Sequence, residues 1–588
     1  MNKITKKLYI LPLMAATLSL SSCIETEQPS DSASSDQINS NSQSFAMLVN
    51  GLKSKMLEWD TYGSTSGGWA EALADWGYPN YMLIRDEMLD GMPSTGTSWN
   101  YQYIFEAATN VSGYAGYPYY YYYSFINNTN RILKSKNEEG ATTEMKQSLA
   151  IVRTYRALCY MQLAMMYEYY KTGIDELDQK AEANGVMGLT VPLSTENTTA
   201  DESKNNPRVP FYTMYRFIYK DLALAEENIG NYARSEKNDI NKDVINGLMA
   251  RFWLNLATRF DRNPDDLALQ VQHEGDEDGF KALGVTTAKE CYQKASEYAQ
   301  KVISAGYTPV TESQWHDANT GFNTANQAWV WDVKYSSTEQ TPRYWCTITG
   351  TFASEPTWAM SAYGGEYRCI SKYLFDEMGD GDWRKTTWVA PEDAGATTVP
   401  AKYETKLQDK TAASVSANTC WSRLPAYANL KFRPAGGNMA SEQEGLLVAL
   451  PLMRVEEMYF IKMEAALHTV GLAEARSELN AFLNTYRYKD GSYDCKATTN
   501  DDFIKEMIAQ KHIEFWGEDV LFADYKRLGL QVNRKRANTN YLAEYQLKSK
   551  AGYAAPWMNF YIPEVERSFN KGVVMNPDPT TYINQYCK

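Results

Sequence analysis

Apolar residues recur with helical spacing over both ends of this chain. Between residues 243 and 260, for example, Leu248, Phe252 and Leu256 lie four residues apart and therefore share one face of a helix. Similar patterns predict helices over 119–135, 144–171, 211–229, 288–305, 452–470, 473–487 and 501–516. The 144–171 segment is apolar nearly all round, so we expect that helix to be buried.

Several of these helices follow one another as hairpins. Ala475, Leu479 and Phe482 share one face just after Gly471, and Ala295 and Ala299 supply small residues in the 288–305 helix. Hairpins with Ala at their crossing points are typical of tetratricopeptide-type repeats, which stack into a right-handed scaffold, although no regular period of about 34 residues is present. We predict a mainly α, tetratricopeptide-like helical-hairpin scaffold, located mainly at 119–305 and 450–530.

Two regions, 60–115 and 306–445, break the helical pattern. Both are rich in Gly, Trp and polar residues, and the second contains eight of the 15 tryptophans: Trp315, Trp329, Trp331, Trp345, Trp358, Trp383, Trp388 and Trp421. Tyr and Trp combine an apolar ring with a polar group and therefore suit surfaces that are partly exposed to water. Because long ordered loops on a rigid scaffold often carry binding sites, we expect these insertions to form the ligand side.

The N-terminus has the pattern of an export signal. Lys3, Lys6 and Lys7 precede a short apolar run, which ends in Leu20-Ser21-Ser22-Cys23. The run is too short to span a bilayer. The small residues before Cys23 resemble the lipobox of bacterial lipoproteins, which implies cleavage after residue 22 and a lipid on Cys23. An ordinary signal peptide with an incidental Cys is the alternative.

Residues 23–44 are expected to form a tether, because this stretch is rich in Ser, Asn, Asp and Gln and cannot build a core. Glu25 and Glu27 resemble the surface-export signal of Bacteroidetes lipoproteins. Loss of residues 1–22 would change the net charge from −14 to −17, which argues against nucleic-acid binding. At about 150 residues per domain the length suggests about four domains, but motifs that run from end to end favour one domain over 45–588.

The remaining seven cysteines do not form a CxxC pair, so neither a zinc ribbon nor a thioredoxin-type site is indicated. Cys159 and Cys291 lie in helical patterns and are expected to be small buried hydrophobes. One bridge among Cys346, Cys369 and Cys420 remains an open alternative.

Catalytic and metal-binding patterns are weak. The chain has no Gly-x-Ser-x-Gly, no His-Glu-x-x-His and no Walker loop, and its four His are scattered. The acidic run from Asp376 to Asp382 could hold Ca²⁺ but lacks EF-hand spacing, so a solvated turn is favoured. A pair of carboxylates suited to glycoside hydrolysis is not excluded among 72 acids. We predict a protein that is not an enzyme and needs no cofactor or metal.

The strongest motifs lie in the C-terminal third. Residues 450–466 contain Arg454, Glu457, Tyr459, Glu464 and Ala465 in the arrangement Arg-x-x-Glu-x-Tyr-x-x-x-x-Glu-Ala. Further motifs are Leu-Asn-Thr-Tyr-Arg ending at Arg487, Glu514 to Glu518 with Asp524, Arg527 and Gly529, Ile562-Pro563 with Glu566, and Asn576-Pro577; Asn127, Asn130, Arg131, Arg153 and Arg156 precede them on N-terminal helices. In this order the motifs resemble the SusD/RagB-like outer-membrane lipoproteins of Bacteroidetes.

The charged residues of these motifs suggest a structural rather than a catalytic role. Arg454, Glu457, Glu464, Glu514 and Arg527 lie on otherwise apolar helices, where buried charges are normally paired. Gln510-Lys511 stands where many family members have Glu-Arg, which puts one local salt bridge in doubt.

The resemblance implies a function. Members of this family sit on the outer membrane facing the cell exterior, beside a SusC-like TonB-dependent transporter, and bind nutrients, usually glycans, that they pass to it without catalysis. The alternatives are peptide capture, as in RagB-like relatives, a surface glycan hydrolase, or a purely structural lid for the transporter.

Candidate ligand residues lie in both irregular regions. Sugar rings have apolar C–H faces that stack on Trp and Tyr, while their hydroxyls need Asn, Asp or Arg partners. The N-terminal region offers Arg85, Asp86, Trp99, Asn100 and Tyr101, and the central insertion offers Tyr344, Trp345, Trp358 and Tyr363. Trp99-Asn100 resembles the Trp-plus-Asn pairing of glycan-binding members.

Overall fold

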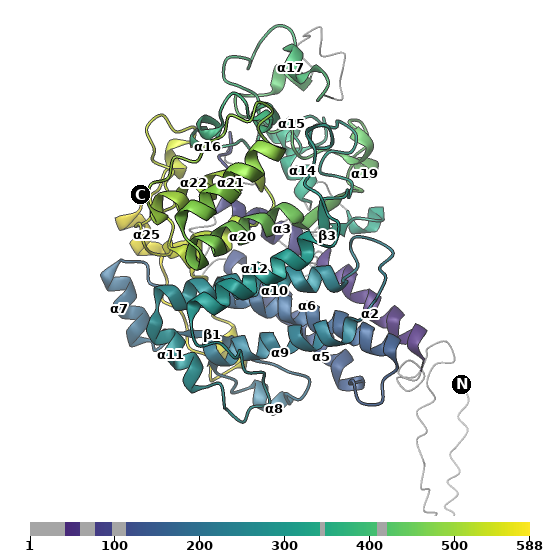
Figure 1. Cartoon of the computed structure of the whole chain (residues 1–588), viewed down its shortest axis with the longest axis vertical. Coiled ribbons are helices and arrows are strands. Elements are labelled where there is room, and N and C mark those ends of the chain that lie inside the picture. The colour runs from purple at the N-terminus through teal and green to yellow at the C-terminus, as the bar shows by residue number, and fades with distance from the viewer. Residues whose placement is uncertain (1–40, 59–76, 97–112, 342–346, 408–419) are drawn as a thin grey trace, which may run out of the picture.

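The computed structural model describes residues 41–58, 77–96, 113–341, 347–407 and 420–588 (Figure 1). The longer helices are α2 (Ser42–Met56), α3 (Tyr78–Glu87), α5 (Gly113–Ser135), α6 (Thr143–Tyr167), α7 (Asp175–Ala183), α9 (Phe211–Ile229), α10 (Lys242–Arg262), α11 (Pro264–Gln272), α12 (Ala288–Ile303), α20 (Val455–Thr469), α21 (Leu472–Tyr486), α22 (Asn500–Glu514) and α23 (Leu521–Leu528). The mainly α prediction is confirmed, and each predicted helix is present.

Shorter elements connect these helices. The short helices include α8 (Ala200–Ser203), α13 (Glu312–Trp315), α14 (Ile348–Phe352), α15 (Met360–Gly364), α16 (Lys372–Glu377), α17 (Ala401–Glu404), α18 (Cys420–Arg423), α19 (Glu442–Gly445), α24 (Glu566–Phe569) and α25 (Thr580–Tyr586). The strands are β1 (Leu189–Pro192), β2 (Arg208–Pro210), β3 (Trp329–Lys334) and β4 (Ala449–Arg454). Three expectations differ: α2 starts inside the predicted tether, at Ser42, α3 lies in a region predicted to be irregular, and residues 452–454, predicted to start a helix, belong to β4.

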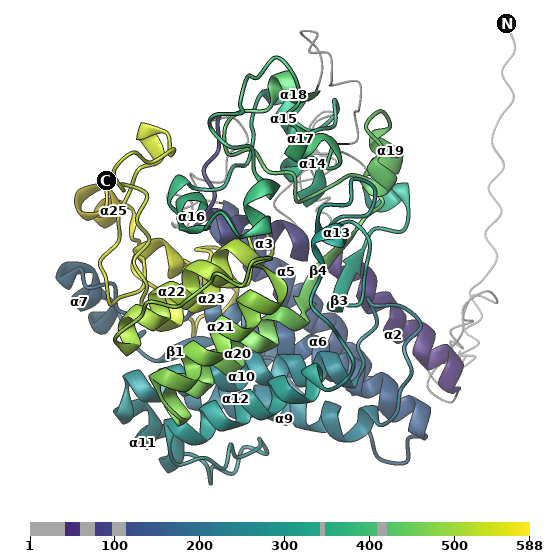
Figure 2. The same cartoon turned by 45° about the horizontal axis from the view of Figure 1, so that its top comes forward.

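The long helices stack as hairpins. α6 packs against α9, α10 against α12, α12 against α20 and α20 against α21. In Figures 1 and 2 these helices fill the lower part of the molecule, and the loop-rich insertion with α14 to α19 lies above them. The tetratricopeptide-like scaffold with long insertions is therefore confirmed.

Local sequence explains where these helices start and stop. α12 begins with a capping box, in which Thr287 Oγ1 accepts from the Glu290 N–H and Glu290 Oε2 accepts from the Thr287 N–H at 3.0 Å. α9 follows Pro210 and ends before Gly230, whose φ is 52°. These signals fix the ends of the helices on which the hairpins depend.

A strand pair joins the loop-rich insertion to the scaffold. β3 and β4 are antiparallel, with Trp329 opposite Arg454 and Lys334 opposite Ala449. Because β4 runs directly into α20, the insertion is fixed to the start of that helix. The sequence did not predict this pair.

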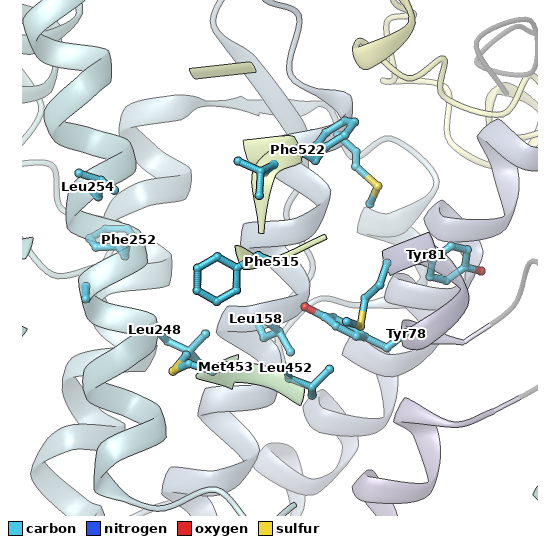
Figure 3. Packing of buried hydrophobic residues seen from close by; sticks show 14 of the residues in the cluster. Tyr78, Tyr81, Leu158, Leu248, Phe252, Leu254, Leu452, Met453, Phe515 and Phe522 are labelled. Atoms are coloured by element: carbon cyan, nitrogen blue, oxygen red, sulfur yellow. The ribbon is translucent and has the colours of Figure 1, made fainter. Parts of the chain in front are cut away.

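Apolar side chains from distant segments meet between the helices. Figure 3 shows Leu158 of α6, Leu248 and Phe252 of α10, and Leu452 of β4 around Phe515. One continuous core of buried apolar residues runs from Phe45 on α2 to Cys587 after α25. A separate cluster of ten buried residues, including Tyr403 and Trp421, lies in the insertion.

The five-tyrosine run on α5, Tyr119 to Tyr123, divides between core and surface. Tyr119, Tyr121 and Tyr122 are buried, whereas Tyr120 is exposed and Tyr123 is half-buried. The Tyr119 and Tyr123 rings lie 4.6 Å apart, one helical turn along α5. The buried members of the run therefore contribute to packing.

Buried ion pairs hold the motif helices together. The Glu514 carboxylate accepts from Arg487 Nε at 2.7 Å, from Arg454 NH1 at 3.0 Å and from Arg384 NH1 at 3.1 Å. Burial by itself would raise the pKa of Glu514, but these guanidinium groups, Arg487 foremost, hold it well below its ordinary value. The carboxylate therefore stays ionised inside the scaffold.

The remaining motif charges are paired as well. Glu457 accepts from Arg251 Nε at 2.7 Å, and Glu464 accepts from Arg527 NH2 at 2.6 Å. Lys511 donates to Asp524 at 2.6 Å, so the departure from the family pattern retains an ion pair at this position. The prediction of structural pairing is confirmed.

Five cysteines, Cys159, Cys291, Cys369, Cys495 and Cys587, are buried free thiols. A bridge that includes Cys369 is therefore contradicted, and the expected burial of Cys159 and Cys291 is confirmed. None of the helices within the described ranges is both long and apolar enough to span a bilayer.

Candidate ligand-binding face

Helix α3 places two of the predicted ligand residues inside the molecule. Arg85 is 0% exposed, and its Nε donates to Asp519 Oδ1 at 2.9 Å. Asp86 is also buried and accepts from the Asp519 N–H at 3.0 Å. These contacts fix α3 to the segment between α22 and α23, so we do not place either side chain on the face that would touch a ligand.

Burial dominates the protonation of this cluster. It raises the pKa of Asp86 well above its ordinary value, and the neighbouring Asp519 carboxylate raises it further. Burial would lower the pKa of Arg85, but the charge of Asp519, its hydrogen bond and the neighbouring Tyr122 and Tyr78 together raise it well above its ordinary value. The charge of Arg85 is thus retained and neutralised by Asp519.

The chain beyond α3 stays buried until it reaches the surface at Thr95, where the central insertion holds it in place. The Thr95 N–H donates to the Tyr367 carbonyl at 3.1 Å, and Thr95 Oγ1 donates to the Gly365 carbonyl at 3.0 Å. Arg368 pairs with Glu87 at the end of α3 and donates to Ser94 Oγ at 3.3 Å. The two irregular regions therefore meet along 94–95 and 365–368.

Short helices α14 and α15 form the rest of this face. α14 packs against both α3 and α15. The Asn429 side-chain amide donates to the Phe352 carbonyl at 2.9 Å and to the Arg368 carbonyl at 3.0 Å, and Ser361 Oγ donates to the Ala353 carbonyl at 2.9 Å. These hydrogen bonds tie the end of α14 to α15 and to the segment around Arg368, which lies beside Ser94 and Thr95.

A glycine turn brings the chain from α15 back towards Thr95. Gly365 follows α15 with φ 68° and ψ 19°, a left-handed conformation that costs other residues free energy. Its carbonyl then accepts the Thr95 hydroxyl. The neighbouring Gly364 belongs to the helix itself.

Trp358 is the described aromatic candidate on this face. Its side chain is half-buried and packs with Met360 and Leu446. A Cβ built on Gly445 would lie 2.6 Å from Trp358 Cζ2, so only glycine leaves room for the indole there. The ring is thus held against α19 while part of it remains open to solvent.

The other aromatic candidates cannot be placed in the same way. Trp99, Asn100, Tyr101, Tyr344 and Trp345 lie outside the described residues, and only the backbone of Tyr363 is described, within α15. Their neighbours in sequence are placed: Thr95 precedes Trp99 by four residues, and Thr347 follows Trp345 by two. Both neighbours belong to the segments that meet here.

Most of the tryptophans that motivated this site are core residues instead. Trp315, Trp329, Trp331, Trp383, Trp388 and Trp421 are all buried. Trp329 and Trp331 lie on β3, and Trp315 packs edge-on against Trp383 with ring centroids 5.5 Å apart. The expectation that they gather on the ligand side is wrong, because strand pairing and loop packing bury them without any helical pattern.

Sequence reasoning missed the residues that position the face. Thr95, Arg368 and Asn429 act through backbone and side-chain hydrogen bonds between segments far apart in sequence. The Gly364-Gly365 pair was the one local signal, since paired glycines mark tight turns.

The acidic run near α16 does not build an oxygen cage. Asp376 pairs with Lys372, Asp380 pairs with Lys385 at 3.2 Å, and buried Asp382 pairs with Arg384 at 2.7 Å. Within the described ranges, no group of three or more His, Cys, Asp or Glu is placed to hold a metal ion.

Comparisons with known proteins agree with this architecture. The model of the SusD family matches residues 315–586. Among curated proteins there is no match. A solved SusD-like carbohydrate binding protein from Bacteroides vulgatus ATCC 8482 has 19% identity and a TM-score of 0.62, covering 91% of this chain and 97% of its own.

Two further structures are similar to this chain. A SusD superfamily protein from Bacteroides thetaiotaomicron VPI-5482 has 17% identity and a TM-score of 0.60 over 91% of this chain and 100% of its own. A SusD-like protein from Bacteroides fragilis NCTC 9343 has 15% identity and a TM-score of 0.60, covering 92% of this chain and 98% of its own.

At such identities the solved structures establish the fold, and that fold is SusD-like. The family match over 315–586 adds the sequence signal. Residues 315–586 therefore match the SusD family, and the chain as a whole has a SusD-like fold.

Proposed function

We propose that this protein binds glycans at the cell surface and delivers them to a SusC-like TonB-dependent outer-membrane transporter, without catalysis. The observation that carries the proposal is the meeting of the two irregular regions at Thr95, Gly365 and α14. The sequence-predicted aromatic residues follow or precede these segments in sequence, and of them Trp358 is described. The carbohydrate-binding relative of the same fold supports the choice of ligand class.

The chemistry of the face suits a sugar. The open part of the Trp358 ring offers an apolar surface for the C–H face of a pyranose. Trp99 follows Gly96 by three residues in sequence, and Trp345 precedes Thr347 by two. We therefore include Trp99 and Trp345 in the proposed platform, with Asn100, Tyr101, Tyr344 and Tyr363 as its polar and aromatic partners.

The test is binding to a panel of soluble and insoluble polysaccharides, measured by affinity electrophoresis and calorimetry. Loss of one stacking ring costs about 0.5–1.5 kcal/mol, so Trp358→Ala and Trp99→Ala should each weaken binding roughly two- to tenfold. Phe569→Ala is the control, because Phe569 is 70% exposed on α24, an element that is not part of this face.

The outcomes separate the alternatives. If no polysaccharide binds while co-purified or library peptides do, the protein captures peptides instead. Release of reducing ends by the pure protein would establish a hydrolase. If a Trp99→Ala, Trp345→Ala double variant retains nutrient uptake, the protein acts only as a structural lid for the transporter.

Surface anchoring is a separate part of the proposal. It rests on the Leu20-Ser21-Ser22-Cys23 sequence, which lies outside the described residues. Metabolic labelling with a fatty acid should mark the wild-type protein and leave Cys23→Ala unlabelled. Equal labelling of both forms would exclude Cys23 as the lipid attachment site, and co-purification of a TonB-dependent transporter with the tagged protein tests the partner.

A further inference from the structure

An open cleft lies on the helical scaffold, between α20 and α21. It has a volume of about 270 Å³. All of the described residues that line it belong to these two helices, so it shares none with the ligand-binding face. In Figures 1 and 2 both helices lie in the scaffold, below the loop-rich insertion with α14 to α19. The cleft is therefore a separate feature of the molecule.

One wall of the cleft comes from α21. Glu478, Ala481, Phe482, Thr485 and Tyr486 recur at intervals of three and four residues along this helix, so they share one side of it. Phe482 is buried, Glu478 and Tyr486 are half-buried, and Ala481 and Thr485 are exposed. The wall thus runs from the core out to solvent, and a molecule in solution can reach it.

The opposite wall comes from α20 and follows the same spacing. Tyr459, Lys462 and Met463 lie at positions i, i+3 and i+4 of this helix. The Met463 side chain is buried, whereas Tyr459 and Lys462 are half-buried. The two helices therefore enclose a cleft with an apolar base and a polar rim.

Two tyrosines form an aromatic corner in the cleft. The Tyr459 and Tyr486 ring centroids lie 6.2 Å apart with planes inclined by 56°, and the Phe482 ring backs them at 5.3 Å and 5.4 Å. The Tyr486 carbonyl accepts from Trp383 Nε1 at 2.9 Å, which fixes this end of α21. Because both tyrosine rings are supported by the core and partly open to solvent, they offer a fixed apolar surface to a ligand.

Two opposite charges lie at the rim. Lys462 Nζ donates to Gln300 Oε1 at 2.7 Å, and since an ammonium group carries three donors it can also donate to a ligand. The Glu478 carboxylate makes no hydrogen bond or ion pair within the part of the chain that the structure describes. Burial raises the pKa of Glu478; Lys462 lowers it and Glu474 raises it. This carboxylate is therefore partly desolvated and is open to a hydrogen-bond donor.

These charges select the class of ligand. A cation would be repelled by Lys462 and an anion by Glu478, whereas a sugar hydroxyl accepts from the first and donates to the second. The volume lies just under the roughly 300–1,000 Å³ of most small-molecule sites, which suits a single ring. An aromatic corner with one donor and one acceptor at its rim therefore matches a neutral pyranose.

We propose that this cleft is a second sugar site, which takes one neutral pyranose unit of a glycan. The C–H face of the sugar packs on Tyr459 and Tyr486, Glu478 accepts from its hydroxyls, and Lys462 donates to them. The choice of a glycan unit rests on the proposed function, but the site is distinct from the ligand-binding face. A polysaccharide chain that engages both sites is held more tightly than by either site alone.

The experiment is saturation-transfer NMR on the full mature protein with glucose, galactose, mannose and xylose as probes. Ala481→Arg fills the cleft and places a guanidinium three residues from Glu478, where the two can pair. It should weaken the binding of at least one probe about tenfold or more. Ala473→Arg is the matched control, because it adds the same charge at an exposed position of α21 outside the cleft; it should bind like the wild type.

A second variant tests the acceptor directly. Glu478→Gln keeps the side-chain volume and removes the charge, so it should weaken binding roughly three- to tenfold. Trp358→Ala should leave the cleft-dependent monosaccharide binding unchanged while it weakens polysaccharide binding at the ligand-binding face. The inference is overturned if Ala481→Arg and Ala473→Arg give the same result with every probe, including the result that none binds. Loss of polysaccharide binding in Trp358→Ala is measured independently, so failure of this inference is distinguishable from failure of the proposed function.

Discussion

At the scale of single residues, buried carboxylates divide into those that have partners and those that do not. Glu514 receives hydrogen bonds from three guanidinium groups, whereas Asp332 Oδ1 receives none from the described residues. The first stabilises the scaffold and the second costs it free energy. Substitutions at the two positions should therefore act in opposite directions.

Glu514→Gln should destabilise the fold. It removes the charge that compensates Arg454 and Arg487 in the interior, and breaking a buried pair in this way costs about 3–5 kcal/mol. Urea unfolding measures the loss. Asp201→Asn breaks an exposed pair with Lys204 and should change the free energy of unfolding by less than about 1 kcal/mol. Equal effects of the two substitutions would show that the Glu514 network does not stabilise the core.

Asp332→Asn should stabilise the protein at alkaline pH. Between its ordinary pKa of 3.8 and its folded value of about 7, the folded state holds a proton that the unfolded state has lost, so stability falls as pH rises through this window. The Asn side chain does not titrate, so the stability of the variant does not fall in this window. It should match the wild type near pH 4 and exceed it at pH 8 by roughly 2–4 kcal/mol. Parallel stability curves for the two proteins would contradict the raised pKa.

At the scale of elements, helix α15 depends on how it ends. Gly365→Ala places an alanine in a left-handed conformation and should cost about 1 kcal/mol of stability. It should also weaken polysaccharide binding, because Gly365 anchors Thr95. Gly364→Ala is the matched control: the added Cβ meets nothing closer than 3.8 Å, and the residue is helical. If both variants behave alike, the turn does not position the face.

Elements defined by local patterns could be predicted from the sequence. The α9 bounds follow from a proline before the helix and a glycine after it, and α6 follows from its apolar length. The β3–β4 pair could not be predicted, because its strands lie more than 100 residues apart in sequence and each is short. Trp329 and Trp331 were misassigned for the same reason, since their burial depends on that pairing.

At the scale of the whole molecule, one apolar core joins both ends of the chain. Phe45 on α2 and Cys587 after α25 belong to the same cluster, and Tyr427 packs against both this cluster and the ten-residue cluster of the insertion. One domain over 45–588 stays a prediction from the sequence motifs, and this continuity gives it a test. Differential scanning calorimetry should show a single unfolding transition. Two resolved transitions would show that the insertion and the scaffold unfold separately.

The five buried thiols have a practical consequence. Burial raises the pKa of each of them, and only the thiolate reacts readily with alkylating reagents. An alkylating reagent should therefore leave these positions unmodified in the native protein. Cys587 lies near the C-terminus, Cys369 in the insertion and Cys159 in the middle of α6. The order in which mass spectrometry finds them modified, as denaturant is added, would report which region of the molecule opens first, without any engineered label.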